Sequence, residues 1–351
     1  MLEFSIIIPT LNSERTLDQC LKYLFSQNYD QSRYQVIVSD GGSIDHTFEI
    51  AKKYKTQIIN NPLQTGEAGK MAGLKIATGE LIVFLDSDNI LIDPDWLFKM
   101  RTPFSDLQIS ASEPIRYDYR LTDHHLTRYF SYIGMGDPLN LFLGNYDRYS
   151  QITGRWTGLD LEQAQMENYI KVHLFPSNMP TIGANGFVLR RNLLDSLKDK
   201  EYLFDVDILN QLQIASNQNN TPSCYVAKVD TGVVHLFSGN LSAFVRKQKR
   251  RAKDYLYYNS INLRYSHNSS NKLTSALYPG GPSTFGLIIF ILSCLTVIPL
   301  LVQAMIGFIK KPDWVWLLHP VVCELTLFIY ASERIKSIFH NSIYDRSKWS
   351  Q

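Results

Sequence analysis

Two carboxylates one residue apart, Asp86 and Asp88, follow directly on the apolar, β-prone stretch ELIVFL. Where a strand opens into a turn, side chains at i and i+2 can both approach one hard cation and leave positions open for phosphate oxygens. Such a cation neutralises the charge that develops on a nucleoside diphosphate as it leaves. The pattern therefore predicts a Mn2+ or Mg2+ site with Asp86 and Asp88 as ligands, and it places Ser87 in the same donor-binding turn.

The DxD spacing alone is a short signal, and it also occurs at Asp93 in DPD and at Asp205 in DVD. Placement at the end of a buried strand distinguishes Asp86. Polar residues follow the two earlier strand-like runs in the same way, at Pro9–Asn12 and at Asp40–Ser43. Because ligands of open α/β sheets bind beyond the carboxyl ends of the strands, we expect these residues to gather at one site.

The elements that must position these residues alternate over residues 1–100. FSIIIPT, YQVIVSD, TQIIN and ELIVFLD are strand-like, and apolar residues at helical spacing lie between them. Strands separated by helices form right-handed crossovers, which give a parallel sheet covered on both faces. The sequence thus predicts an α/β protein with a Rossmann-like, mostly parallel sheet. No GxGxxG follows the first strand, which argues against a nicotinamide or flavin site.

An ordered set of motifs suggests a family. The chain contains SIIIPTLNSERTL, VIVSDGGSIDHT, GKMAGLKIATGELIVFLDSDN and GANGFVLRR, in that order. It resembles the family 2 glycosyltransferases, which are inverting enzymes of the GT-A fold that use sugar nucleotides. The resemblance is close over about the first 100 residues and looser to about residue 255. It implies a GT-A fold, a nucleotide-sugar donor and a divalent metal.

The resemblance also implies roles for single residues on the donor side. Asp40 and the loop after the first strand match positions that hold the nucleoside, and the alternative for Asp40 is a turn former in SDGGS. Lys70 matches a basic residue that meets the pyrophosphate, but Met71 replaces the family's asparagine, and an ordinary solvated lysine is the alternative. The donor-binding residues that we predict are Pro9, Thr10, Asn12, Glu14, Asp40, Ser43, Lys70, Asp86, Ser87 and Asp88.

Inversion requires a base that takes the proton of an acceptor hydroxyl on the face opposite the leaving group. Family members carry EDxD at about this point, and FDVD matches its last three positions, with Phe204 replacing the glutamate. The resemblance therefore implies Asp205 as the catalytic residue. The alternative is that Asp205 caps a helix.

Acceptor or phosphate contacts are predicted at two further motifs. GANG contributes Gly183, Asn185 and Gly186, and QKRRA resembles a QxxRW motif through Gln248 and Arg251, with alanine in place of the tryptophan. Arginines there suit a diphosphate or a lipid phosphate, and a basic helix resting on anionic headgroups is the alternative. His235, in GVVHLFSG, is either a further metal or phosphate contact or a buried core histidine.

The C-terminal part is apolar. No charged residue occurs from Thr284 to Ile309, which is long enough for a transmembrane helix, with a buried core helix as the alternative. A second segment, Trp314–Tyr330, contains His319, Pro320 and Glu324 and is either the second helix of a hairpin or an interfacial segment. The predicted domains are a GT-A catalytic domain at 1–258 (nucleotide-binding half 1–100, acceptor half 101–258), a linker at 259–283, a membrane segment of one or two helices at 284–330 and a basic tail at 331–351.

Charge and cysteine content restrict the partners. A net charge of +2 gives no basis for nucleic-acid binding, and cysteines without a CxxC pair suggest neither a zinc site nor a disulfide framework. We predict a membrane-anchored enzyme whose catalytic domain is cytoplasmic and whose acceptor is lipid-linked, either a polyprenyl phosphate or a lipid-linked glycan. The alternatives are a soluble or polysaccharide acceptor, or a catalytically silent GT-A-like scaffold.

Overall fold

The computed structural model describes residues 2–175, 178–197, 203, 208–209, 224–236, 240–260 and 284–339. Most of the predicted linker and the end of the predicted basic tail lie outside these residues. The chain forms two compact units that interleave along the sequence. The sheet unit comprises Met1–Tyr119, Asp160–Pro176 and Ile182–Leu236, and the helical unit comprises Arg120–Leu159, Ser177–Thr181 and Phe237–Gln351. The predicted division into nucleotide-binding and acceptor halves remains a prediction.

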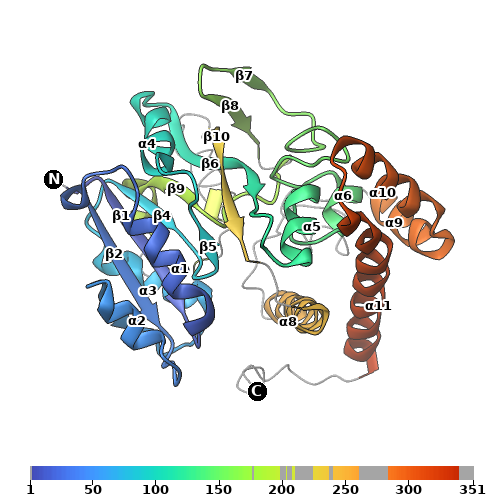
Figure 1. Cartoon of the computed structure of the whole chain (residues 1–351), viewed down its shortest axis with the longest axis horizontal. Helices are drawn as coiled ribbons and strands as arrows, with labels where there is room; N and C mark the ends of the chain where they lie inside the picture. The colour runs from blue at the N-terminus through green and yellow to red at the C-terminus, as the bar shows by residue number, and fades with distance from the viewer. Residues whose placement is uncertain are drawn as a thin grey trace. The chain divides into compact units, whose positions relative to one another are not determined.

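The first part of the sheet is parallel, as the alternating pattern predicts (Figure 1). Its strands lie in the order β3-β2-β1-β4. They are β1 (Phe4–Thr10), β2 (Tyr34–Asp40), β3 (Gln57–Asn60) and β4 (Leu81–Phe84), joined by α1 (Glu14–Phe25), α2 (Thr47–Lys53) and α3 (Gly66–Ile76). Thr10 pairs with Asp40 in the register of β1 and β2, so both strands end at the same level.

Beyond β4 the sheet is mixed rather than mostly parallel. β9 (Phe187–Arg190) runs antiparallel to both β4 and β6 (Ile109–Asp118), and β10 (Cys224–His235) runs parallel to β6. The short β5 (Asn89–Ile90) and β8 (Tyr169–Leu174) pair antiparallel with β10, and β7 (Gln163–Gln165) extends β8. Further short elements of this unit are η1 (Gln31–Arg33), α4 (Trp96–Arg101), η2 (Thr102–Ser105) and η3 (Arg191–Leu197). The predicted α/β class is confirmed.

Helices cover both faces of β1. Phe4, Ile6 and Ile8 are fully buried in the same core as the apolar side of α1, while Ile7 lies on the opposite face against α3. The approach of α3 requires Gly69 and Gly73, one helical turn apart. A Cβ at Gly69 would lie 2.8 Å from the Cβ of Pro9, and one at Gly73 would overlap Ile7. These two glycines therefore set how closely α3 packs beneath the end of β1.

Glu3, just before β1, anchors the opposite end of the sheet unit. Its carboxylate accepts hydrogen bonds from Tyr29 and Arg33, and Arg101 Nε donates to it over 2.9 Å. Burial acts to raise the pKa of Glu3, but the Tyr29 hydrogen bond and the charges of both arginines outweigh it and hold the pKa below the ordinary 4.5. The ionised form is therefore the one that the fold stabilises.

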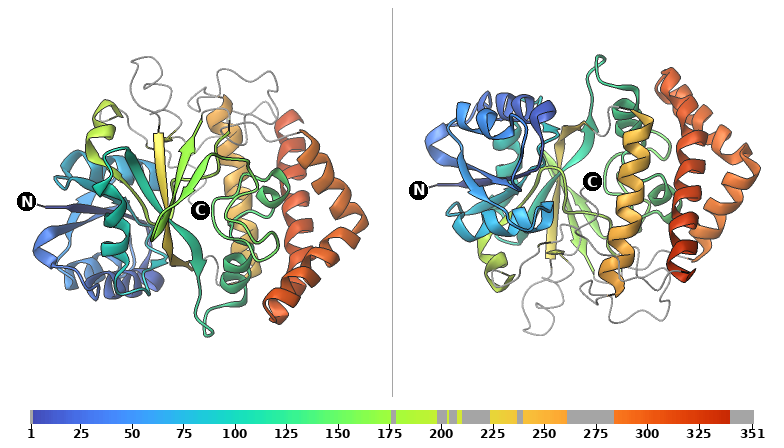
Figure 2. Two further views of the ribbon diagram at one scale, coloured as in Figure 1. Left: turned by 90° about the horizontal axis from the view of Figure 1, so that it is seen from above. Right: turned by 90° about the horizontal axis from the view of Figure 1, so that it is seen from below.

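The helical unit contains α5 (His125–Ile133), α6 (Leu139–Leu143), α8 (Leu241–Ser260), α9 (Thr284–Thr296), α10 (Ile298–Lys310), η4 (Trp314–Leu317) and α11 (Leu318–Phe339). α8 lies alongside α11 in both views of Figure 2.

The single transmembrane helix predicted from Thr284 to Ile309 is not formed, because α9 and α10 meet at 94°. Pro299 has no N–H to donate and its ring would clash with an earlier carbonyl, so a straight helix cannot pass through it. The chain instead turns at Val297, whose φ is +62°, and Pro299 falls in the first turn of α10.

The predicted segment Trp314–Tyr330 is shorter than the segment at 284–309, but it forms most of α11, which is longer than either α9 or α10. Within the described residues, one helix, Trp314–Ile338, is long and apolar enough to cross a bilayer. If the bent pair α9–α10 is taken as a single broken span, there are two such segments.

Candidate functional site

The predicted donor residues gather at the carboxyl edge of β1, β2 and β4. The Asp40 carboxylate is held there by four hydrogen bonds. Oδ1 accepts from Thr10 Oγ1 over 2.9 Å and from Ser43 Oγ over 2.6 Å, and Oδ2 accepts from the backbone N–H groups of Gly42 and Ser43 over 3.0 and 2.9 Å. Asp40 thus does form its own turn, as the alternative reading proposes. The same contacts fix the direction of a carboxylate that remains partly exposed at this edge.

The loop after β1 is joined to the loop after β2. Asn12, at a φ of +51°, donates its N–H to Ser43 Oγ over 2.8 Å and accepts from the Ile44 N–H at Oδ1 over 3.0 Å. Glu14 donates its N–H to Asp45 Oδ2 over 3.1 Å. Pro9 lies beneath this loop, against Gly69 of α3. Both loops therefore form one continuous rim beside Asp40.

Lys70 links α3 to the turn after β4. Its Nζ lies 3.2 Å from Asp86 Oδ1, and its side chain is only 5% exposed. The alternative of an ordinary solvated lysine is therefore wrong. A buried ammonium is stable only with a charged partner, so Lys70 and Asp86 fix each other's positions. Ser87 Oγ donates to Ser13 Oγ over 3.1 Å and so connects this turn to the rim.

Asn89 organises the turn, and we did not predict it. Its side chain is fully buried, its Oδ1 accepts from the Asp86 N–H over 3.1 Å, and its Nδ2 donates to Asp88 Oδ1 over 3.2 Å and to Asn185 Oδ1 over 3.0 Å. The asparagine directly after DSD was the available signal. Asn185 in turn donates to Tyr117 Oη over 3.0 Å, so a predicted acceptor residue joins the network around Asp88.

His235 lies next to the second carboxylate of the motif. The pairing of β5 with β10 sets His235 opposite Asn89, and His235 Nε2 lies 3.4 Å from Asp88 Oδ2. Its ring packs on Tyr117 with centroids 5.8 Å apart. His235 is thus a buried residue beside Asp88, as the second of its two predicted roles requires, and its contact with a metal or phosphate remains a prediction.

The two predicted glycines have structural roles. Gly183 donates its N–H to Glu113 Oε1 over 3.0 Å, and Glu113 forms a fully buried ion pair with Lys228. At Gly186, φ is +87° and a Cβ would lie 2.9 Å from the Trp96 ring. At Gly183 φ is +128°, so a backbone requirement accounts for both glycines, and contact with an acceptor or phosphate remains a prediction for each.

Gln248 and Arg251 belong to α8 in the helical unit. Arg251 donates to the Gly136 carbonyl over 2.7 Å and to Gln248 Oε1 over 3.3 Å, and Gln248 is fully buried. These contacts stabilise the turn before α6, and the predicted phosphate role stays a prediction. Asp205 and Phe204 lie outside the described residues.

The donor atoms around Asp88 fit a divalent cation. Among the residues that the structure describes, no group of three or more His, Cys, Asp or Glu side chains is arranged to hold a metal. The carboxylate of Asp88 and the imidazole of His235 nevertheless lie side by side at the donor edge, where Asp86 also projects. Ions such as Mg2+ use one or two protein ligands together with substrate phosphates and water, so this smaller set suffices.

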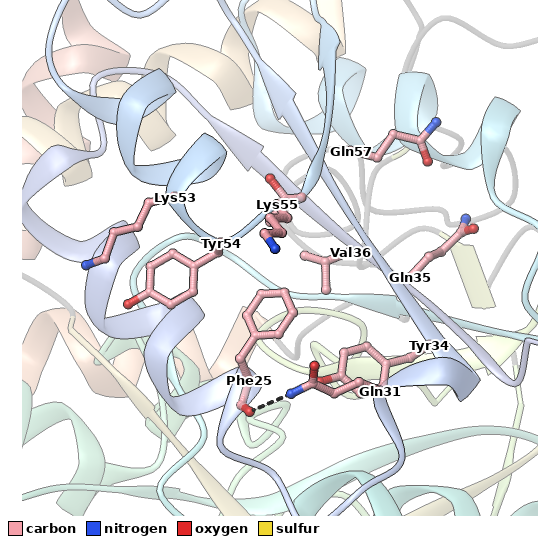
Figure 3. Close-up of a pocket in the computed structure, with 10 residues that line it drawn as sticks. Phe25, Gln31, Tyr34, Gln35, Val36, Lys53, Tyr54, Lys55 and Gln57 are labelled. Carbon is pink, nitrogen blue, oxygen red and sulfur yellow. Dashed lines mark hydrogen bonds between the residues drawn. The ribbon is translucent and has the colours of Figure 1, made fainter.

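A separate hollow of about 500 Å³ lies away from this edge (Figure 3). It is lined by Tyr34–Val36 at the start of β2, by Phe25 at the end of α1 and by Lys53–Gln57. Because these residues stand at the amino ends of β2 and β3, the hollow contains none of the predicted site residues.

The sequence profile of Glycosyl transferase family 2 matches residues 5–197, more than half of the chain. The chain belongs to this family. Its β1–β4 core and the DSD turn lie inside the matched region, so the predicted family and GT-A fold are confirmed.

Curated relatives match only a part of this chain. A poly(ribitol-phosphate) beta-N-acetylglucosaminyltransferase, TarS, from Staphylococcus aureus is 35% identical over 97 residues, which are 26% of this chain and 17% of TarS. Glycosyltransferase AglE from Haloferax volcanii is 36% identical over 90 residues, 24% of this chain and 30% of AglE. A dolichyl N-acetyl-alpha-D-glucosaminyl phosphate 3-beta-D-2,3-diacetamido-2,3-dideoxy-beta-D-glucuronosyltransferase from Methanococcus voltae is 34% identical over 86 residues, 22% of this chain and 27% of that one. The matches thus span less than a third of each of these relatives.

Solved structures are similar over a larger share of the chain. One is the mannosyltransferase PcManGT from Pyrobaculum calidifontis in complex with GDP-Man and Mn2+. The superposition covers 94% of this chain and 87% of the PcManGT chain at 14% sequence identity, with a TM-score of 0.48. The superposition with S. aureus TarS 1-349 covers 98% of this chain and 93% of the TarS chain at 16% sequence identity, with a TM-score of 0.46.

Proposed function

We propose that the protein transfers a sugar, with inversion, from a nucleotide-sugar donor to a lipid-linked acceptor and that it requires a divalent metal. The observation that carries the donor half is the convergence of Asp40, Asp86 and Asp88 at one edge of the sheet, with Lys70 3.2 Å from Asp86 and His235 3.4 Å from Asp88. Membership of Glycosyl transferase family 2 supports it.

Each part of this edge suits one part of the donor. The fixed carboxylate of Asp40 can accept hydrogen bonds from the hydroxyl or N–H groups of a nucleoside, and the rim formed by Asn12 and Ser43 borders that position. The ammonium of Lys70 supplies positive charge next to Asp86, where the pyrophosphate would lie. The donor would therefore extend from the β2 end of the edge to the β4 end.

Asp88 and His235 would hold the metal, with Asp86 beside them. A bound Mn2+ or Mg2+ would supply Lewis-acid stabilisation of the departing diphosphate. Asn89 keeps the Asp88 carboxylate in position, and the partly buried Tyr117 ring limits the movement of His235. Asp205 stays our proposal for the base that receives the acceptor proton.

Two observations support a lipid-linked acceptor and a membrane location, and the proposal that the catalytic part is cytoplasmic follows from the cytosolic supply of sugar nucleotides. The helical unit exposes a long apolar surface on α9 and α10, and the M. voltae relative is named for a dolichyl phosphate-linked acceptor. A polymer acceptor is the second candidate, because TarS is named for poly(ribitol-phosphate).

Release of nucleoside diphosphate from each UDP- and GDP-sugar, with Mn2+ and with EDTA, tests the donor half. We expect turnover with one donor class, its loss in EDTA, and a decrease of about 100-fold or more in Asp88→Asn. The exposed Glu49→Gln is the control and should keep the wild-type rate. Wild-type turnover in Asp88→Asn, or no turnover with any donor, would contradict the proposal, and the second result would favour the silent scaffold.

Transfer of labelled sugar separates the acceptors. Membranes and purified poly(ribitol-phosphate) are offered in parallel, and lipids are extracted after the reaction. Label in the lipid fraction supports the lipid-linked acceptor, whereas label in the polymer alone would overturn it.

A further inference from the structure

We infer that α9 and α10 lie within one leaflet of a bilayer, with their exposed apolar faces in the acyl region, and do not cross it. This inference extends the membrane location that we proposed for the enzyme. Large apolar side chains are between 38% and 73% exposed along both helices. They are Phe285, Ile288, Ile289, Leu292 and Leu295 on α9, and Ile298, Leu301, Val302, Met305, Ile306, Phe308 and Ile309 on α10.

Helix length excludes a crossing by either arm. α9 and α10 have 13 residues each, which corresponds to about 20 Å at 1.5 Å per residue. The hydrocarbon core is about 30 Å thick, and two arms bent by 94° reach together at most about 27 Å along the membrane normal, and only if both are equally tilted. Two short apolar arms at a right angle are instead suited to shallow insertion.

The other side of each arm is already occupied by protein. Phe290 and Cys294 of α9 and Leu300 of α10 are buried in a cluster with Leu139 of α6 and Cys323 of α11. The arms therefore divide into a side packed on the helical unit and a side without protein cover among the described residues. Interfacial helices combine a lipid-facing side and a protein- or water-facing side in the same way.

α11 is long enough to cross, but its charges argue against crossing. Glu324 is exposed and lies near the middle of Trp314–Ile338, where a carboxylate in hydrocarbon would be costly. On its buried side α11 carries His319, which bonds to Tyr129 of α5, so this side faces the protein. α11 thus supports the bent pair from within the unit.

The chemistry of the exposed set favours lipid over a second copy of the chain. Protein interfaces carry a polar rim and about one hydrogen bond per 100–200 Å². Apart from Lys310 at the end of α10, the exposed large side chains of α9 and α10 are aliphatic, aromatic or thioether, and no charged residue occurs from Thr284 to Ile309. The exposed pair Lys310 and Lys311 ends the apolar surface, where it would meet anionic headgroups.

Cysteine labelling in sealed membrane vesicles tests the topology without any measurement of activity. The native cysteines within the described residues are all buried, so single cysteines introduced as Lys311→Cys and Leu107→Cys can be labelled selectively. Leu107 is 88% exposed in the sheet unit. We expect a membrane-impermeant maleimide to reach both positions from the same side of the vesicle. Labelling of position 311 only from the opposite side would show a crossing and overturn the inference.

Vesicle binding tests the lipid contact itself. The double variant Leu301→Asp/Met305→Asp should bind vesicles of phosphatidylcholine and phosphatidylglycerol at least about tenfold more weakly than wild type, with an unchanged circular dichroism spectrum. The control Leu107→Asp should bind like wild type. Undiminished vesicle binding of the double variant, or loss of a wild-type dimer with vesicle binding retained, would overturn the inference in favour of contact between two copies. Neither readout depends on sugar transfer, so an inactive protein with wild-type binding would refute only the proposed function.

Discussion

Replacing Asn89 by alanine tests how the candidate site is held together. The side chain is fully buried and makes three hydrogen bonds, with the Asp86 N–H, Asp88 Oδ1 and Asn185 Oδ1, at 3.0 to 3.2 Å. Each such bond contributes about 1 kcal/mol, and the buried Asp86 N–H left without its partner adds about 1 kcal/mol or more. We therefore expect Asn89→Ala to lower the free energy of unfolding by about 2–4 kcal/mol.

Urea denaturation measures this difference, and Asn28→Ala provides the control. Asn28 is exposed and makes one side-chain hydrogen bond, to Asp95, so its loss should change the free energy of unfolding by less than about 0.5 kcal/mol. At a temperature where Asn89→Ala is folded, its affinity for Mn2+ with nucleoside diphosphate should also fall, because Asp88 has lost the partner that orients it. An Asn89→Ala protein as stable as the control would refute the view that this amide organises the turn.

Three further substitutions test separate parts of the structure. Lys70→Met should lower the free energy of unfolding by about 1–3 kcal/mol, because it leaves the Asp86 carboxylate without its charged partner, and it should weaken nucleoside diphosphate binding about tenfold in calorimetry; unchanged affinity would exclude the pyrophosphate role. Gly73→Ala should destabilise the protein by about 1–3 kcal/mol in urea denaturation through overlap with Ile7, whereas Gly66→Ala, with open space around it, should be neutral or stabilising; equal effects would contradict the close packing of α3. The pKa of Glu3 is lower in the folded state, so the stability that its ionised carboxylate contributes is fully present above pH 4.5 and is lost as the pH falls through the folded pKa. Glu3→Gln should therefore be less stable than wild type at pH 7 and closer to wild type at pH 3 in urea denaturation. A difference in stability that does not change with pH would contradict this.

Local sequence patterns predict those strands and helices whose formation depends only on residues within one short segment. Alternating runs such as FSIIIPT and YQVIVSD specify strands, and their order specifies parallel pairing, so Asp40 and Asp86 were correctly expected at one edge. Such short runs do not predict which distant segments of the chain pair with each other. The contact of His235 with Asp88 depends on β10 returning to pair with β5, and the role of Asn89 depends on the same pairing.

Hydropathy was a poor guide to the C-terminal helices for a similar reason. The run from Thr284 to Ile309 is apolar throughout, yet the helix breaks at Val297, two residues before Pro299, because backbone sterics near a proline do not enter an average over side-chain polarity. The reverse holds for α11, where His319 and Glu324 lower the mean hydropathy but leave the helix intact. His319 finds partners inside the helical unit and Glu324 is exposed, and neither side chain interrupts the backbone hydrogen bonds of the helix.

The central claim is that the acidic turn after β4 holds a metal together with a nucleotide. Isothermal titration of nucleoside diphosphate in the presence and absence of Mn2+, with wild type and Asp88→Asn, measures it most directly. We predict binding that is at least about tenfold tighter with Mn2+ in the wild type and no such gain in the variant. An equal gain in both proteins, or none in the wild type, would contradict the account.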